Sequence, residues 1–235
     1  GMSVSSGGDF NGDGRRDILI SALRFSSSSQ ATIYVIVGNG SSVIGGAGGG
    51  VSGKPLVVSV DGLGNNSYFK IVSVKGSFTG LSVSWLGDMN GDGYDDVGIG
   101  SAPYQSGGSV EQQTYVVYGR DWVGIRRDVS TNGNVLWLSG LRSGVDGFVV
   151  RGGGFMVSGL GDVDGDGLSD MMVSSYGGWL GKGNAYITVY PANITHFPSI
   201  APSSRPSSSP SELKHLSISP SSNPTDPQTN EGTFP

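Results

Sequence analysis

The sequence contains no cysteine and only two histidines in 235 residues. Disulfide bridges and thiolate metal sites are therefore excluded, and the redox compartment stays open. His196 and His215 lie in or beside a Ser/Pro-rich stretch, which lacks the rigid pocket that a catalytic imidazole needs. Neither a nucleophile elbow nor a phosphate-binding loop occurs. We therefore expect that the protein is not an enzyme.

Charge and long apolar runs are also scarce. Charged residues make up 14% of the chain, and the formal net charge is −5. Ten of the 19 acidic residues recur at fixed positions of three short segments, so no basic or acidic surface is indicated elsewhere. No apolar run approaches the length of a membrane span. We expect no nucleic-acid partner and no direct insertion into a membrane.

Glycine, by contrast, is abundant, with 42 residues. Short runs of β-branched and aromatic residues alternate with Gly, Asn and Ser, and no segment has convincing helical periodicity. Many short strands joined by tight turns follow from this composition. The sequence therefore predicts an all-β fold.

Three nine-residue segments follow the pattern D-x-[ND]-G-D-G-x-x-D and begin at Asp9, Asp88 and Asp162. Each places three or four carboxylates close together, which is self-repelling unless a cation lies among them. Hard oxygen atoms at alternate positions, with glycines for a tight turn, suit calcium. The alternative is a set of ordinary Asx/Gly turns. That alternative does not explain the fifth oxygen position, position 9, which is an aspartate in all three segments.

The segments belong to a longer repeat. In each unit a short alternating run enters the acidic segment, an apolar run leaves it, and a second β-rich run follows. Val135-Leu136-Trp137-Leu138 is predicted as an outer strand of the second unit. Repetition of one strand unit is typical of a propeller or solenoid. The predicted organisation is repeat 1 at 1–79, repeat 2 at 80–153, a truncated repeat 3 at 154–190 and a tail at 191–235.

These units resemble the FG-GAP repeat of integrin α-chain N-terminal β-propellers. Phe78 and Gly80 stand near the FG of the second unit, and residues 100–103 read Gly-Ser-Ala-Pro, near its GAP. The resemblance implies about three blades. Propellers use about four to eight blades. We therefore expect an incomplete propeller here, with the remaining blades supplied from residues upstream of Gly1.

The resemblance, together with oxygen chemistry, implies about three calcium ions. The implied side-chain ligands are Asp9, Asn11, Asp13 and Asp17 in the first segment, Asp88, Asn90, Asp92 and Asp96 in the second, and Asp162, Asp164, Asp166 and Asp170 in the third. The implied backbone carbonyl ligands are those of Arg15, Tyr94 and Leu168. An EF-hand is rejected because position 12 of each segment is Ile or Val in place of a bidentate Glu.

By the same resemblance, the function is that of a calcium-binding, non-catalytic module for cell adhesion, located outside the cell or at its surface. The partner would be a protein or glycan ligand of the extracellular matrix or cell surface. Two alternatives stay open: an accessory propeller of a secreted hydrolase, and a glycan-binding lectin propeller. In the lectin alternative Trp122 and Trp179 are contact residues, whereas Trp85 and Trp137 are expected to pack in the core.

The C-terminal stretch differs in composition from the rest. Nine of the 11 prolines lie in residues 191–235, mixed with serine runs. Such a segment does not bury enough apolar surface to fold, so we expect a disordered stalk. Possible N-glycosylation sequons at Asn39, Asn65 and Asn193 fall in predicted turns or in this tail, as expected of a secreted glycoprotein.

Overall fold

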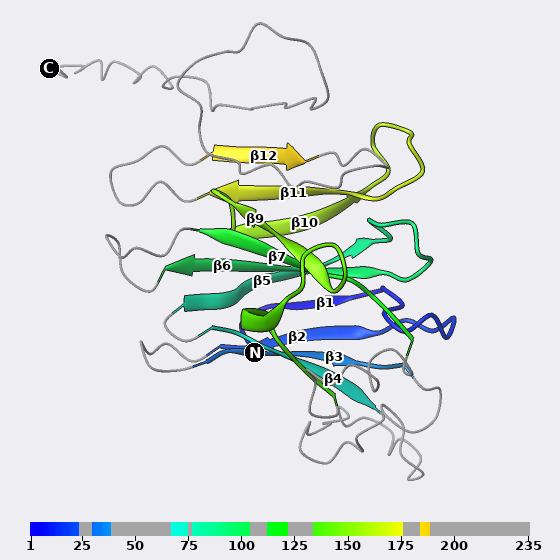
Figure 1. Cartoon of the computed structure of the whole chain (residues 1–235), viewed down its shortest axis with the longest axis horizontal. Helices are drawn as coiled ribbons and strands as arrows, with labels where there is room; N and C mark the ends of the chain where they lie inside the picture. Colours follow the sequence, from blue (N-terminus) through cyan, green and yellow to red (C-terminus); the bar gives the residue numbers. More distant parts are fainter. Residues whose placement is uncertain are drawn as a thin grey trace, which may run out of the picture.

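The computed structural model describes residues 1–23, 30–38, 67–74, 77–103, 112–121, 134–175 and 184–188. These residues form twelve strands (Figure 1): β1 (Val4–Ser6), β2 (Ile18–Ala22), β3 (Thr32–Ile36), β4 (Tyr68–Val72), β5 (Ser77–Gly87), β6 (Asp96–Pro103), β7 (Gln113–Val117), β8 (Val135–Trp137), β9 (Gly147–Arg151), β10 (Met156–Gly161), β11 (Asp170–Ser175) and β12 (Asn184–Thr188). A short 3₁₀ helix, Leu138–Gly140, follows β8. No helix in these parts of the chain is long and apolar enough to cross a membrane.

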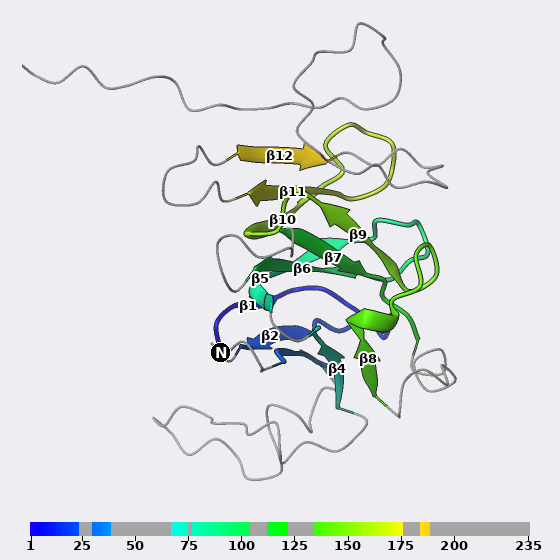
Figure 2. The same ribbon diagram turned by 60° about the vertical axis from the view of Figure 1, so that its left-hand side comes forward.

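The strands form three sheets. Sheet 1 has the order β1-β2-β3-β4-β8, sheet 2 the order β5-β6-β7-β9, and sheet 3 the order β10-β11-β12. Neighbouring strands are antiparallel throughout, apart from β4 and β8. The sheets are stacked face to face in both views of the molecule (Figures 1 and 2). The predicted all-β fold of repeated antiparallel sheets is therefore confirmed.

The outer strand predicted for the second unit is wrong. β8 pairs in parallel with β4 of sheet 1, with Ile71 opposite Leu136. The edge of sheet 2 is occupied by β9, which pairs with β7. Leu136 and Leu138 are buried in the core between sheets 1 and 2. Pairing with β4 therefore buries more apolar surface than an exposed position at the edge of sheet 2 would. β8 thus ties sheet 1 to the chain that builds sheet 2.

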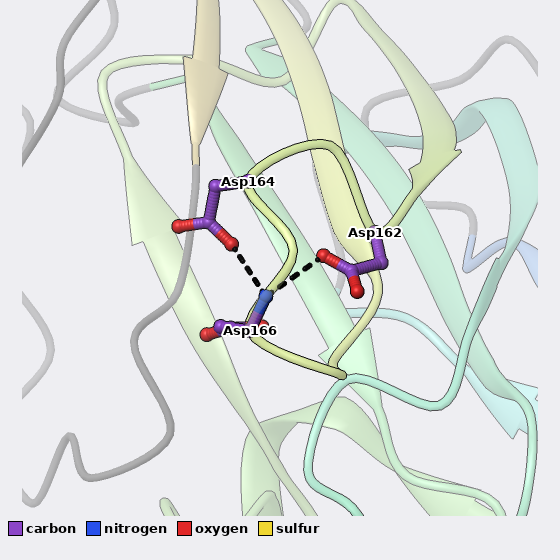
Figure 3. Close-up of side chains that lie close together, drawn as sticks. All are labelled: Asp162, Asp164 and Asp166. Atoms are coloured by element: carbon purple, nitrogen blue, oxygen red, sulfur yellow. Dashed lines mark hydrogen bonds between the residues drawn. The ribbon is translucent and has the colours of Figure 1, made fainter.

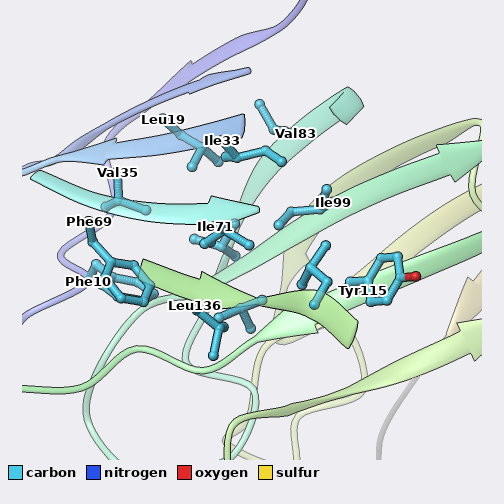
Figure 4. Close-up of a cluster of buried hydrophobic side chains, with 13 residues drawn as sticks. Phe10, Leu19, Ile33, Val35, Phe69, Ile71, Val83, Ile99, Tyr115 and Leu136 are labelled. Carbon is cyan, nitrogen blue, oxygen red and sulfur yellow. The ribbon is translucent and has the colours of Figure 1, made fainter. Parts of the chain in front are cut away.

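Two apolar cores hold the stack together. The core between sheets 1 and 2, which we call core 1, contains Phe10, Leu19, Ile33, Val35, Phe69, Ile71, Val83, Val97, Ile99, Tyr115, Val117, Leu136 and Leu138 (Figure 4). Core 2, between sheets 2 and 3, contains Leu86, Met89, Val116, Phe148, Val150, Val157, Met171 and Val173. Sheet 2 serves both cores because successive side chains of a strand point to opposite faces.

The four tryptophans have separate outcomes. Trp85 packs against core 1, with its ring 6.5 Å from that of Phe10. Trp137 is 42% exposed, so its predicted place in the core is wrong. Its neighbour Leu136 takes the inward face of β8, and strand alternation turns Trp137 outward. Trp122 and Trp179 lie outside the described residues, as do the tail and the three asparagines of the predicted sequons.

Candidate metal centre

The three acidic segments form loops at the same end of the stack, each joining the first strand of its sheet to the second (Figure 1). We call them loop 1 (residues 9–17), loop 2 (residues 88–96) and loop 3 (residues 162–170), and we number the positions in each from 1 to 9. Their placement follows from antiparallel pairing, because successive loops on equivalent strands return to the same edge of the stack. The repeat therefore aligns three sets of carboxylates.

In each loop the backbone turns around the carboxylate of the aspartate at position 1, which accepts backbone N–H groups from the same loop. Its Oδ2 accepts the backbone N–H of the glycine at position 6. These hydrogen bonds are Gly14 to Asp9 at 2.7 Å, Gly93 to Asp88 at 2.8 Å and Gly167 to Asp162 at 2.9 Å. The N–H at position 5 is donated to Oδ1 of the same aspartate. The sequence pattern thus fixes one turn geometry three times.

Loop 3 brings three acidic side chains together. Single carboxylate oxygens of Asp162, Asp164 and Asp166 lie within 4.8 Å of one another, and all three residues are exposed. The first two accept the backbone N–H of Asp166, at 3.1 and 3.2 Å (Figure 3). Among the described residues, this group of three acidic side chains could hold a metal ion. A hard cation is the group that such a set of oxygens suits.

Position 3 distinguishes the loops. In loops 1 and 2 it is asparagine, whose Nδ2 donates to the carboxylate at position 5: Asn11 to Asp13 at 3.2 Å and Asn90 to Asp92 at 2.9 Å. In loop 3 it is Asp164, and an ionised carboxylate has no proton to donate. In loops 1 and 2 a neutral amide therefore makes an attractive contact with the carboxylate at position 5, whereas in loop 3 two carboxylates repel each other. Loop 3 has the greatest need of a cation.

Loop 1 contains a second sign of a missing partner. Asn11 is only 7% exposed, and its Oδ1 is buried without a hydrogen-bond partner. A buried amide oxygen left unpaired costs about 1–3 kcal/mol. A cation held by Asp9, Asn11 and Asp13 would satisfy this oxygen. The residues present in loop 1 therefore fit a bound divalent ion.

The aspartate at position 9 is placed differently from the others. Asp17, Asp96 and Asp170 are all completely buried. In each loop this carboxylate accepts the backbone N–H of position 2 at 2.9 Å. The second oxygens of Asp17 and Asp96 accept N–H groups that follow the third strand, at Gly38 and Gly119, both at 2.8 Å.

Position 9 therefore anchors the loop to its sheet. In loop 3 the structure does not include this residue in the group formed by positions 1, 3 and 5. Direct ligation by position 9 stays a prediction. The sequence did carry a signal for the anchoring role, because each of these aspartates directly precedes an apolar run.

Burial changes the acidity of two of these anchors. Desolvation raises the pKa of Asp17 to about 6 and that of Asp96 to about 8, although the backbone N–H groups that they accept act in the opposite direction. The neighbouring carboxylates Asp92 and Asp88 raise the pKa of Asp96 further. A nearby cation would favour the ionised forms. Without a cation, the ionised loop carboxylates therefore lower the stability of the folded state.

The residue at position 7 was predicted to give a backbone carbonyl ligand. Its N–H is donated to the carboxylate at position 5, at 2.9 Å for Arg15, 3.0 Å for Tyr94 and 2.9 Å for Leu168. This hydrogen bond fixes the orientation of the residue within the loop. Ligation by its carbonyl oxygen stays a prediction.

Residues 1–52 match the sequence profile of the FG-GAP repeat family. This range contains β1, loop 1, β2 and β3. The first unit is therefore similar to an FG-GAP repeat. Loops 2 and 3 lie outside the matched range, but they repeat the hydrogen bond of loop 1 from the glycine at position 6 to the aspartate at position 1. Both histidines lie outside the described residues.

Proposed function

We propose that this FG-GAP repeat protein binds about three calcium ions, one in each loop, and acts as a non-catalytic interaction module outside the cell or at its surface. Its ligand would be a protein or glycan of the matrix or of another cell. The observation that carries the proposal is the threefold recurrence of one oxygen-lined loop, with three carboxylates within 4.8 Å in loop 3.

The donor chemistry supports calcium in particular. Positions 1, 3 and 5 offer only carboxylate and amide oxygens, which are the ligands that Ca²⁺ prefers over the nitrogen and sulfur ligands of zinc. When bound, the ion would supply charge neutralisation and a common partner for these oxygens. Asp162, Asp164 and Asp166 would hold it in loop 3, and Asp9, Asn11 and Asp13 in loop 1.

Exposure of the loops supports an extracellular setting. The three carboxylates of loop 3 are exposed, so they gain little from a low dielectric and would bind weakly. Sites with dissociation constants of about 0.1–1 mM are filled by the calcium concentration outside cells. The FG-GAP repeat is the reason to assign an adhesive role to such a module.

The buried acids favour a structural role for the site. Asp17 and Asp96 accept backbone N–H groups, and Asp146 is held by two arginines. Each is engaged in holding a loop or a turn in place, as a scaffold requires. The proposed ions thus stiffen the loop end of the stack. The ligand would bind to other surfaces, whose sheets are held in fixed positions by these loops.

The test is binding of the full chain to immobilised matrix proteins and to a glycan array, in 2 mM calcium (about the extracellular level) and in EDTA. Calcium-dependent binding that weakens in Asp166→Ala would support the proposal. Equal binding in both buffers, or turnover of a hydrolase substrate by the chain itself, would contradict it. A glycan-only response would favour the lectin alternative.

A further inference from the structure

Neighbouring loops are in direct contact, and the same contact occurs between loops 1 and 2 and between loops 2 and 3. The backbone N–H of position 8 in one loop is donated to the carbonyl oxygen of position 1 in the loop before it. Asp95 N–H is donated to Asp9 O at 3.1 Å, and Ser169 N–H to Asp88 O at 2.9 Å. Loop 3 is thereby connected to loop 2, and loop 2 to loop 1.

The peptide group that makes each contact also belongs to a predicted ligand. The N–H of Asp95 and the carbonyl of Tyr94 are the two ends of one peptide, and so are the N–H of Ser169 and the carbonyl of Leu168. A cation on the carbonyl would polarise the N–H at the other end and strengthen its hydrogen bond. The acceptor of that bond is the position 1 residue, itself a predicted ligand of the previous loop.

Side chains support the same contact. The ring of Tyr94 lies against Gly12, where an added Cβ would be 2.6 Å from Cε1 of the ring. Leu168 lies against Gly91, with the corresponding distance at 3.3 Å. Both glycines have positive φ, +69° and +77°, so the turn and the contact each favour glycine. Position 7 of one loop thus packs on position 4 of the loop before it.

The contact between loops 1 and 2 has one addition. Asp95 Oδ2 accepts the backbone N–H of Asp9 at 2.7 Å, so Asp95 holds both backbone groups of that residue. In loop 3 the equivalent residue is Ser169, whose Oγ lies beside Gly87. Asp95 is outside the predicted ligand set.

A second path joins the buried anchors of the same two loops. Phe10 donates its N–H to Asp17, and its carbonyl accepts the N–H of Arg120 at 2.9 Å. The preceding residue, Gly119, donates to Asp96 at 2.8 Å. The anchors of loops 1 and 2 are therefore connected through the 119–120 turn.

We propose that the cation sites of loops 1 and 2 are coupled, so that binding at one raises the affinity of the other, with Asp95 as the positioning residue. A cation in loop 1 fixes the Asp9 peptide, and Asp95 transmits that order to the Tyr94 carbonyl of loop 2. The coupling is reciprocal, as thermodynamic linkage requires. It rests on the proposed calcium binding, and its test separates the two.

The test uses the full chain and the backbone amide signals of Gly14, Gly93 and Gly167 in a ¹⁵N-¹H correlation spectrum. Each of these N–H groups is donated to the position 1 aspartate of its own loop, so each signal reports one site. In a calcium titration of the wild type, we expect the Gly14 and Gly93 signals to change together, in one transition steeper than simple binding.

Three variants separate geometry from charge. Asp95→Ala removes the acceptor, and it should raise the calcium midpoints of the Gly14 and Gly93 signals by about fivefold, the lower end of measured couplings. Asp95→Asn keeps an oxygen for the Asp9 N–H and should stay within about twofold of the wild type. Ser169→Ala is the matched control at the same position of loop 3 and should leave both midpoints unchanged.

Two results would overturn the coupling while leaving calcium binding intact. One is unchanged Gly14 and Gly93 midpoints in Asp95→Ala. The other is an equal loss in Asp95→Ala and Asp95→Asn, which would assign the effect to charge. If none of the three glycine signals responds to calcium, the proposed function fails and the coupling fails with it. Circular dichroism of each variant shows whether it is folded.

Discussion

The junction between sheets 1 and 2 and the junction between sheets 2 and 3 share the same loop contacts but differ in how many apolar side chains they bury. Among the described residues, core 1 contains thirteen buried apolar side chains and core 2 contains eight. Core 1 includes the stacked rings of Phe10 and Phe69, 5.5 Å apart, and the two leucines that follow from the crossing of β8. The first junction is therefore stabilised mainly by apolar burial.

Strand β6 shows how one sheet serves two different neighbours. Val97 and Ile99 face core 1, whereas Gly98 and Gly100 face sheet 3. A Cβ on Gly98 would lie 2.8 Å from Cγ2 of Val157, so the absence of a side chain lets sheet 3 approach closely. The junction between sheets 2 and 3 thus has fewer buried side chains than the first, and its backbones lie closer together at Gly98 and Gly100. A larger share of its stability is then left to the loops.

The largest expected difference lies at position 2 of the loops. Phe10 in loop 1 is fully buried in core 1, and Met89 in loop 2 is 5% exposed in core 2. We expect Phe10→Ala to lower the free energy of unfolding by about 4 kcal/mol and Met89→Ala by about 2 kcal/mol. Denaturant unfolding in calcium measures both. Equal losses would mean that the two junctions contribute alike.

The next effect concerns Asp146, which holds the turn that leads into β9. Asp146 is fully buried, and it accepts hydrogen bonds from Arg120 Nη1 at 2.9 Å and Arg142 Nε at 2.7 Å. Arg120 in turn donates its backbone N–H to Phe10. We expect Asp146→Ala to lower the free energy of unfolding by about 2 kcal/mol, because it removes the shared acceptor of these charge-assisted hydrogen bonds, while Arg142, half exposed, stays solvated.

The pH dependence gives an independent reading of the same cluster. Burial raises the pKa of Asp146, but the hydrogen bonds from Arg142 and Arg120 outweigh it and hold that pKa at about 2, below the ordinary 3.8. Because folding lowers this pKa, the ionised carboxylate stabilises the folded state at pH values above 3.8. This contribution is lost as the pH falls towards 2. The stability difference between wild type and Asp146→Asn should therefore shrink only below pH 3.8. A difference that is constant from neutral pH down to 2 would contradict the ion pairs.

A glycine series at position 4 tests the contact between loops. Gly12, Gly91 and Gly165 all have positive φ, so replacement by alanine strains each backbone by about 1–2 kcal/mol. A Cβ on Gly12 would clash with Tyr94, one on Gly91 would press on Leu168, and one on Gly165 would meet no atom within 4 Å. Melting temperatures should fall most for Gly12→Ala and least for Gly165→Ala. A uniform fall would show that the loops do not press on one another.

The smallest expected effect, counted per site, comes from the loss of a single ion. At calcium about ten times its dissociation constant, each site adds about 1.4 kcal/mol. EDTA should therefore lower the melting temperature, and Asp166→Ala should reduce that shift by one site. Asp121→Ala, which replaces an exposed aspartate outside the loops, is the matched control.

Because loop 3 lacks the bridging amide, hydrogen exchange in EDTA should rise more in β10 and β11 than in β5 and β6. A uniform rise would remove the distinction between the junctions.

The sequence predicted the parts of the structure that local pattern determines. The three loops and the strands beside them follow from alternating apolar residues and from fixed spacings of aspartate and glycine. It did not predict that β8 joins sheet 1, because parallel pairing between Lys70 and Val135 depends on two segments far apart in the chain. The contact of Asp95 with Asp9 was missed for the same reason: the repeat pattern does not specify position 8.

The central claim is that each loop holds a cation, and calorimetry of the intact, chelator-treated chain tests it most directly. Titration with calcium should show uptake of about three ions, reduced by one in Asp13→Ala, Asp92→Ala and Asp166→Ala, at the weak affinities of extracellular sites. The contradicting result is a folded protein that takes up no calcium at millimolar concentration.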